Sequence, residues 1–206
     1  MINKFFAYEG WYYRVFSFLA DLVLLSFLFL FPALTIVLLG PALIALYQTC
    51  DRLYQERDIP TIKTYLTVFK TQFKRGLALD GLLVVYTLIV LGIVYSLMEL
   101  STYLSILSII LITFATLYSM MFILIDSLYD FDLKQTAKES IYFVLSSTAN
   151  AIILVVLPVI GLLVFNKINL YLFICIGIGA IAYTQVFFFK RVVVKEERDE
   201  VDGNPK

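Results

Sequence analysis

The sequence contains no histidine and only two cysteines, Cys50 and Cys175, among its 206 residues. Without histidine, both the commonest metal ligand and the commonest acid–base group at neutral pH are missing. The two cysteines do not have the spacing of a metal-binding or redox pair. No nucleophile–base pair and no glycine-rich phosphate-binding loop occurs either. We therefore expect no enzyme activity, no metal site and no cofactor.

The chain also lacks an excess of charge of either sign, because sixteen basic residues balance sixteen acidic ones. A nucleic-acid-binding protein needs a basic surface, so nucleic acid is not an expected partner. Apolar residues are abundant instead: they make up 61% of the chain, and the mean hydropathy is +0.91. Soluble domains use about 45–50% apolar residues. The sequence therefore predicts an integral membrane protein.

Apolar runs of about the length needed to cross a bilayer occur at residues 15–31, 77–97, 102–125, 148–165 and 170–189. Residues 32–50 are also apolar, but Pro32 and the Gly40-Pro41 pair interrupt them. Proline is comfortable in the first turn of a new helix and kinks a helix interior. This stretch is therefore either a second span or a continuation of the first. We predict an all-α, polytopic membrane helix bundle of six, alternatively five, transmembrane helices.

Basic residues orient the predicted spans, since they accumulate in cytoplasmic loops. Six spans place 15 of the 16 basic residues in the cytoplasm and only Lys167 outside, whereas five spans move Lys4 and Arg14 outside and give 13 against three. We therefore prefer six spans in the cell membrane, with both termini cytoplasmic. Residues 1–192 form a single membrane domain in this prediction, and residues 193–206 form a charged, disordered tail.

The stretch from Tyr47 to Leu77 is the most basic part of the chain. Within it, apolar residues recur at a helical spacing, and most basic residues fall off that face. The apolar positions are Ile62, Tyr65, Leu66, Phe69 and Phe73. This pattern predicts an amphipathic helix that lies on the cytoplasmic interface and contacts anionic lipid headgroups; the alternative is a docking surface for a partner protein. The candidate lipid- or partner-binding residues are Lys63, Lys70, Lys74 and Arg75.

A short pattern, D-x-L-Y, occurs twice, at Asp51–Tyr54 and Asp126–Tyr129, 75 residues apart. Each copy ends a predicted span and precedes a semi-polar segment with helical periodicity. The second segment carries an apolar face at Leu133, Ala137, Ile141, Val144 and Leu145. We therefore predict three hairpins joined by two cytoplasmic, interfacial amphipathic helices. Small residues recur on one helical face in and just before the predicted span at residues 102–125: Ser101, Ser105, Ser108, Ala115 and Ser119. We predict that they form a helix-packing seam; the alternative is the polar lining of a substrate path.

Ionisable and amide side chains at membrane depth are costly and tend to have a role. The candidates for an intramembrane polar site are Asp21, Asp80, Asp126 and Asn150. Asp21 lies deepest in its span. It is either a proton or substrate site of a small secondary transporter, or a structural group that is hydrogen-bonded across the bundle or paired with a basic residue such as Arg14.

Residues 15–80 resemble the YesL-like family of bacterial multi-pass membrane proteins of unknown function. The resemblance rests on four segments: residues 20–25 (ADLVLL), residues 31–36 (FPALTI), residues 45–47 (ALY) and residues 64–76 (TYLTVFKTQFKRG). Val37 and Gly40-Pro41 depart from the family pattern. Members often accompany sugar-uptake genes, so the resemblance implies an accessory or scaffold role in carbohydrate uptake. It also implies a partner such as a sugar-importer permease.

Overall fold

The computed structural model describes residues 11–35, 37–56, 59–100, 102–129, 131–168, 171 and 173–201. Within these ranges the secondary structure is helical and contains no strand, which confirms the all-α prediction. In chain order the helices are α2 (Trp11–Ala33), α3 (Leu39–Gln55), α4 (Thr61–Thr71), α5 (Phe73–Leu100), α6 (Thr102–Leu128), α7 (Leu133–Ser146), α8 (Thr148–Ile168), the π-helical turn η1 (Phe173–Gly177) and α10 (Ile178–Val201). Since α10 continues to Val201, part of the predicted disordered tail is helical.

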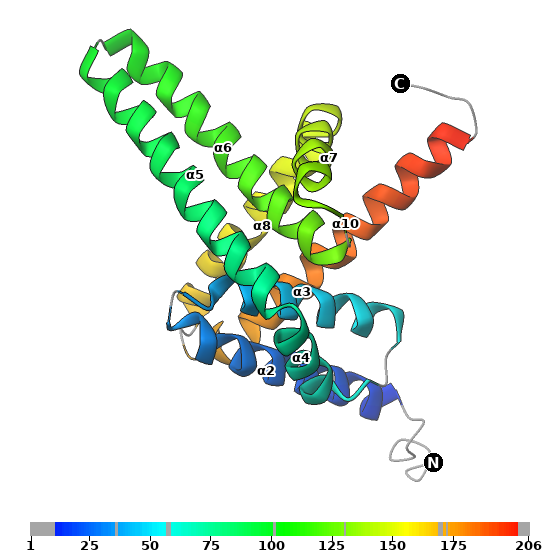
Figure 1. Cartoon of the computed structure of the whole chain (residues 1–206). Coiled ribbons are helices and arrows are strands. Elements are labelled where there is room, and N and C mark those ends of the chain that lie inside the picture. The colour runs from blue at the N-terminus through cyan, green and yellow to red at the C-terminus, as the bar shows by residue number, and fades with distance from the viewer. Residues whose placement is uncertain are drawn as a thin grey trace.

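Four helical segments of the described chain are long and apolar enough to cross a membrane: Tyr12–Ala33, Phe73–Glu99, Leu104–Leu128 and Phe173–Val193. A fifth is present if α7 and α8, which meet at an angle of 101°, are counted as one bent span. The polytopic character of the chain is thus confirmed. Figure 1 shows α5 and α6 as an antiparallel hairpin that rises away from the other helices, and this is one of the predicted hairpins.

The second predicted span, residues 32–50, is where the structure departs from the prediction. The chain leaves α2 after Ala33 and enters α3 at Leu39, so residues 15–46 do not form one helix. However, α3 is not among the helices long and apolar enough to cross a membrane. Its 17 residues extend only about 25 Å at 1.5 Å per residue, against roughly 30 Å of hydrocarbon. Its last turns also contain Asp51 and Arg52.

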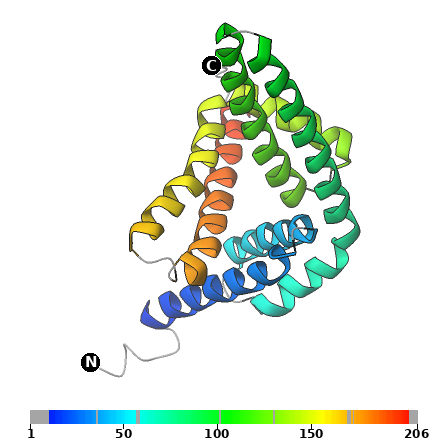
Figure 2. The ribbon, with the colours of Figure 1, turned by 90° about the vertical axis from the view of Figure 1, so that its left-hand side faces the viewer.

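Contacts at its two ends show how α3 lies. Near its start, the Gly40 amide bonds to Asp80, close to where α5 begins. Near its end, Asp51 pairs with Lys190, whose ammonium group lies over the ring of Tyr129, just after α6 ends. Both ends of α3 therefore lie near the open end of the α5–α6 hairpin, which we call the hairpin base. Helix α3 crosses below this base and runs back alongside α2 in the opposite direction (Figures 1 and 2).

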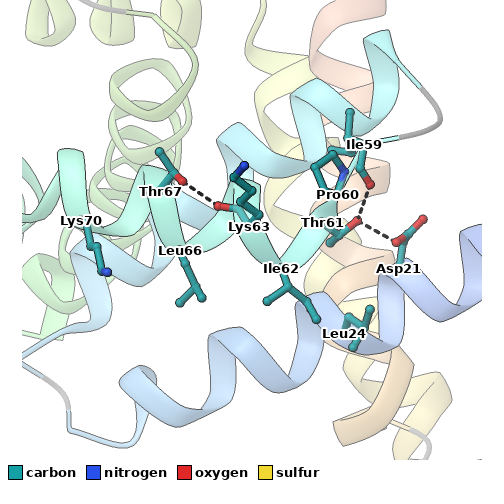
Figure 3. Close-up of a pocket in the computed structure, with 10 residues that line it drawn as sticks. All are labelled: Asp21, Leu24, Ile59, Pro60, Thr61, Ile62, Lys63, Leu66, Thr67 and Lys70. Carbon is teal, nitrogen blue, oxygen red and sulfur yellow. Dashed lines mark hydrogen bonds between the residues drawn. The ribbon is translucent and has the colours of Figure 1, made fainter.

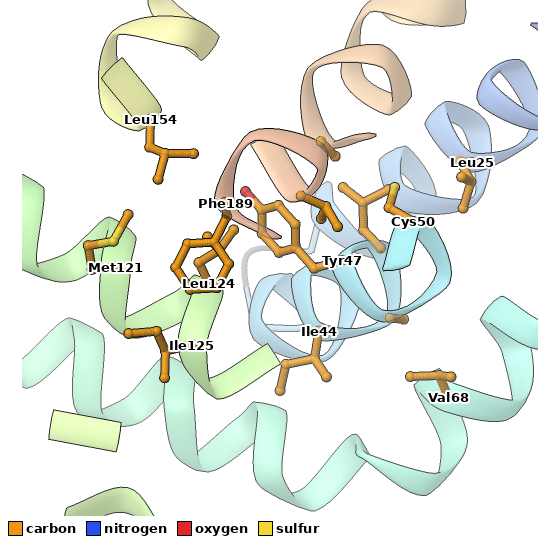
Figure 4. Packing of buried hydrophobic residues seen from close by; sticks show 14 of the residues in the cluster. Leu25, Ile44, Tyr47, Cys50, Val68, Met121, Leu124, Ile125, Leu154 and Phe189 are labelled. Atoms are coloured by element: carbon orange, nitrogen blue, oxygen red, sulfur yellow. The ribbon is translucent and has the colours of Figure 1, made fainter. Parts of the chain in front are cut away.

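The core of the protein is built around α3. Ile44, Ala45 and Cys50 are fully buried, because helices α2, α4, α5, α6 and α10 all pack against α3. Figure 4 shows Tyr47 and Ile44 on α3 among side chains from α6, α8 and α10. Packing against five helices buries most of α3, which explains how an apolar segment too short to span is accommodated.

The predicted small-residue seam of α6 faces its neighbours. Ser108 is buried, and Ser105, Ala115 and Ser119 are half-buried; Ser101 lies outside the described residues. The hydroxyls of Ser108 and Ser119 donate hydrogen bonds to carbonyls one turn back in their own helix. These hydroxyls are therefore satisfied within α6, which favours packing over a substrate path.

The 75-residue repeat extends through both connecting helices. Helix α4 ends in a break at Gln72 and α7 ends in one at Ser147, 75 residues later. Buried positions repeat at the same offset of 75 residues. Those in α4 are Thr61, Tyr65 and Val68. Their counterparts in α7 are Thr136, Ser140 and Phe143. The segment α3–α4–α5 is thus repeated, in the same order, by α6–α7–α8.

Candidate functional site

A pocket of about 670 Å³ lies between α2 and α4. Its wall on α2 includes Asp21 and Leu24, and α4 contributes side chains of both apolar and basic character (Figure 3). Those on α4 include Ile62, Lys63, Leu66 and Lys70. The structure therefore brings three of the predicted site residues, Asp21, Lys63 and Lys70, to one place.

The pocket exists because α4 packs on its neighbours through one face and leaves part of its predicted membrane-facing apolar face uncovered. Thr61, Thr64, Tyr65 and Val68 are buried, whereas Ile62 is 47% and Leu66 46% exposed. Of the five apolar positions identified in the sequence, Tyr65 is the one that is fully buried. Two aliphatic side chains therefore remain uncovered beside α2.

Asp21 is hydrogen-bonded across two helices. The Thr61 hydroxyl, in the first turn of α4, donates to Asp21 Oδ1 at 2.6 Å. The carboxylate thereby ties the middle of α2 to the start of α4. This arrangement agrees with the structural interpretation of Asp21, while its position on the pocket wall leaves it accessible to a ligand.

Asp80 caps a helix to which it does not belong. The backbone N–H of Gly40 donates to Asp80 Oδ2 at 2.8 Å, and no side chain at the N-cap position of α3 bonds to that end of the helix. The first N–H groups of a helix lack intrahelical partners and carry partial positive charge. A carboxylate from α5 therefore satisfies and neutralises the N-terminus of α3.

Asp126 forms a buried ion pair with Arg75. The Arg75 guanidinium donates to Asp126 Oδ1 at 2.8 Å and to the Phe131 carbonyl at 2.9 Å. The Asp126 side chain is completely buried, and that of Arg75 is 24% exposed. Arg75 thus points into the protein, where it joins the start of α5 to the end of α6 and to the chain that leads into α7.

The remaining predicted residues lie apart from the pocket. Lys74 is exposed near the start of α5, and Asn150 is half-buried near the start of α8. Within the described ranges, no group of three histidine, cysteine, aspartate or glutamate side chains is arranged to hold a metal ion.

Neither Lys190 nor Gln185 was singled out from the sequence as a candidate site residue. Lys190 pairs with Asp51 at 3.1 Å, although both residues were visible as charges at the ends of apolar runs. The buried Gln185 accepts a hydrogen bond from the Tyr47 hydroxyl at 2.9 Å and donates one to the Leu154 carbonyl at 3.0 Å. A single glutamine within an apolar run indicates a buried polar group that needs partners. The sequence does not show which partners these are, because they lie far from Gln185 along the chain.

Together, the helices and their internal polar contacts define a polytopic α-helical membrane protein whose intramembrane polar groups mainly connect helices. Residues 22–97 match the model of a family described as a protein of unknown function, DUF624. The match begins within α2 and extends through most of α5, so it includes the Gly40–Asp80 contact and all of the residues that line the α2–α4 pocket except Asp21. No curated protein sequence and no solved structure matches the chain.

Proposed function

We propose that this chain is a YesL-like, non-enzymatic accessory or scaffold component of the cell membrane that assists carbohydrate uptake. The family match over residues 22–97 supports the YesL-like assignment. The observation that carries the accessory role is the use of the polar groups in the bundle. Asp80 caps α3, Asp126 holds Arg75, and Gln185 bonds to α3 and α8. Each contact connects two helices, whereas a solute path needs polar groups that line a route through the membrane.

The α5–α6 hairpin supplies a surface for a membrane partner. It extends from the base as two long helices whose outer side chains are strongly exposed, with Leu88 and Ile109 as examples (Figure 1). Such a surface is suited to lipid and to the apolar helices of another membrane protein. We propose that the partner is the permease of a sugar importer.

Affinity purification in mild detergent tests this role. We expect a tagged copy of the chain to recover the permease from native membranes under conditions that induce both proteins. An unrelated multi-pass protein with the same tag and expression level is the control. Recovery of the chain alone, under the same conditions, would count against the accessory role.

The second candidate function is a small secondary transporter that uses Asp21 as a proton or substrate site. The specific observation in its favour is that Asp21 lines the α2–α4 pocket. A carboxylate that must bind and release a proton cannot be replaced by an amide. This requirement separates the two functions.

We predict that Asp21→Asn leaves the uptake phenotype within about twofold of wild type, since an amide oxygen still accepts the Thr61 hydrogen bond. The measurement is sugar uptake or growth, normalised to the amount of protein in the membrane. Thr61→Val, which removes the same hydrogen bond but keeps the carboxylate, is the matched control. Loss of uptake in Asp21→Asn with normal uptake in Thr61→Val would favour the transporter instead.

The charge distribution supports a cytoplasmic location for the connecting helices and the C-terminal end. We expect a cysteine introduced at Lys138 to be protected from a membrane-impermeant maleimide in intact cells, and one at Lys167 to react. Cys50 and Cys175 are first replaced by alanine. A cysteine introduced at Arg14 distinguishes the two span counts. Six crossings place it in the cytoplasm, where it is protected from the maleimide, and five place it outside, where it reacts. Reaction at Lys138 together with protection at Lys167 would reverse the proposed orientation.

A further inference from the structure

We propose that the α2–α4 pocket binds one anionic phospholipid, with the phosphate at the lysines of α4 and the upper part of an acyl chain between the two helices. This inference does not rest on the accessory role, because a scaffold and a transporter are equally able to hold a structural lipid.

The apolar part of the pocket is suited to an acyl chain. Leu24 on α2 faces Ile62 and Leu66 on α4, and Figure 3 shows these side chains in the space between the two helices. Exposure of both α4 side chains to water is unfavourable by about 25 cal/mol for each Å² of apolar surface. Because α2 is one of the helices able to cross a membrane, the pocket adjoins a surface where lipid chains are available.

The basic part of the pocket is suited to a phosphate group. Lys63 and Lys70 both line it, and they lie seven residues apart, about two helical turns on one side of α4. Neither ammonium group has a hydrogen-bond or ion-pair partner among the described residues. Arg75, in the same basic stretch, is by contrast bound to Asp126. Two unpaired cations beside an apolar slot complement an anionic headgroup attached to a chain.

The position of Asp21 gives the lipid a direction. Its carboxylate bonds to Thr61, at the opposite end of α4 from Lys70. Nine residues separate Thr61 from Lys70, which corresponds to about 13 Å along the helix. The phosphate therefore lies toward Lys70, away from the carboxylate.

The internal repeat provides a comparison within the same molecule. At the 75-residue offset, Lys138 and Ile141 of α7 correspond to Lys63 and Leu66, and both are exposed. Helix α4 lies beside α2 as well as α3 and α5, whereas α7 packs on α6 and α8, the counterparts of α3 and α5. Helix α7 thus matches one of the two pocket lysines, whereas Leu145 stands at the position of Lys70, and among the described helices α7 has no counterpart of the α2 wall. A bound lipid requires both walls, so the site belongs to α4.

Lipid titration of the purified full chain tests the proposal. We expect dioleoyl-phosphatidylglycerol, added to the protein in detergent, to raise the unfolding temperature saturably. Dioleoyl-phosphatidylcholine and inorganic phosphate should have little effect, since one lacks the net charge and the other lacks the chain. An equal rise with inorganic phosphate alone would identify a simple anion site and overturn the proposal, as would an equal rise with phosphatidylcholine.

A pair of matched double variants locates the site. We expect Lys63→Gln with Lys70→Gln to weaken phosphatidylglycerol binding about thirtyfold, at roughly 1 kcal/mol for each basic group. Lys134→Gln with Lys138→Gln removes the same charge from α7 and should change the affinity less than about twofold. Equal weakening by the two double variants would indicate diffuse attraction to the protein surface and contradict a defined site.

Two further measurements apply if the first double variant does not fold. Native mass spectrometry of the wild-type chain should retain about one phosphatidylglycerol molecule at low lipid concentration. Leu66→Gln, which adds polarity to the apolar wall and leaves both lysines in place, should weaken retention severalfold, and Ile141→Gln on α7 should not. The absence of any retained lipid, or equal losses in the two glutamine variants, would overturn the proposal.

Discussion

Replacement of Arg75 by alanine is expected to lower the free energy of unfolding by about 3–5 kcal/mol, because it leaves the buried carboxylate of Asp126 without its positive partner. The Asp126 side chain has no exposed surface, and Arg75 Nη2 donates to Asp126 Oδ1. The same nitrogen donates to the Phe131 carbonyl, which is left without this donor as well. The variant therefore removes the contacts that join the start of α5 to the end of α6 and to the chain that leads into α7.

Three companion variants make this expectation specific. Arg75→Lys keeps the charge but not the planar, multiply donating guanidinium, so we expect an intermediate loss. Arg75→Met combined with Asp126→Leu removes both charges and should recover a large part of the stability. Lys74→Ala, at the exposed neighbouring position, should change stability by no more than about 0.5 kcal/mol. Thermal unfolding in one detergent ranks the four proteins, and equal effects of Arg75→Ala and Lys74→Ala would show that the pair contributes no stability.

Replacement of Gly76 by alanine is expected to destabilise the protein by about 1–3 kcal/mol, because it forces α3 away from α5. A Cβ atom at Gly76 would meet the backbone of Pro41, and one at Gly40 would meet the carbonyl oxygen of Gly76. Backbone atoms cannot turn aside as a flexible side chain can. The same displacement would stretch the hydrogen bond from the Gly40 amide to Asp80, so the cap of α3 weakens too.

Gly92 in the same helix is the matched control. A Cβ atom there meets nothing within 4 Å. Gly92→Ala should leave the protein unchanged or raise its stability by up to about 1 kcal/mol, since alanine favours a helix over glycine. Unfolding temperatures and the yield of monodisperse protein measure both variants. Similar behaviour of Gly76→Ala and Gly92→Ala would contradict the close approach of α3 to α5.

The helices that are simplest to predict are those whose character follows from local composition. The α5–α6 hairpin is one example, because two long apolar runs separated by a very short connection leave little choice of arrangement. The connecting helix α7 is another, since its alternation of polar and apolar residues has a helical period and is bounded by turns. Both are present in the structure close to the expected residues.

The candidate site was only partly predictable. Asp21, Lys63 and Lys70 were each identified from the sequence, but their meeting in one pocket depends on which face α4 turns toward α3. Apolar spacing predicts an amphipathic helix whose apolar face, with Ile62 and Leu66, is turned toward the membrane, and both side chains are exposed in the structure. The face that packs on the protein contains Thr61, Thr64, Tyr65 and Val68, and contacts with α2, α3 and α5 determine it.

The sequence by itself determined that this chain is a helical membrane protein, where most of its long helices lie, and that two amphipathic connecting helices follow two copies of one motif. These properties depend on the transfer of side chains from water to lipid, which is nearly additive along the chain. Only the tertiary structure decided that α3 crosses below the hairpin base and which charges are paired. The partners of these contacts are far apart in the sequence, 51 residues for Arg75 and Asp126 and 138 for Tyr47 and Gln185. Side-chain composition shows that a buried polar group needs a partner, but only the packing of the helices selects which one it finds.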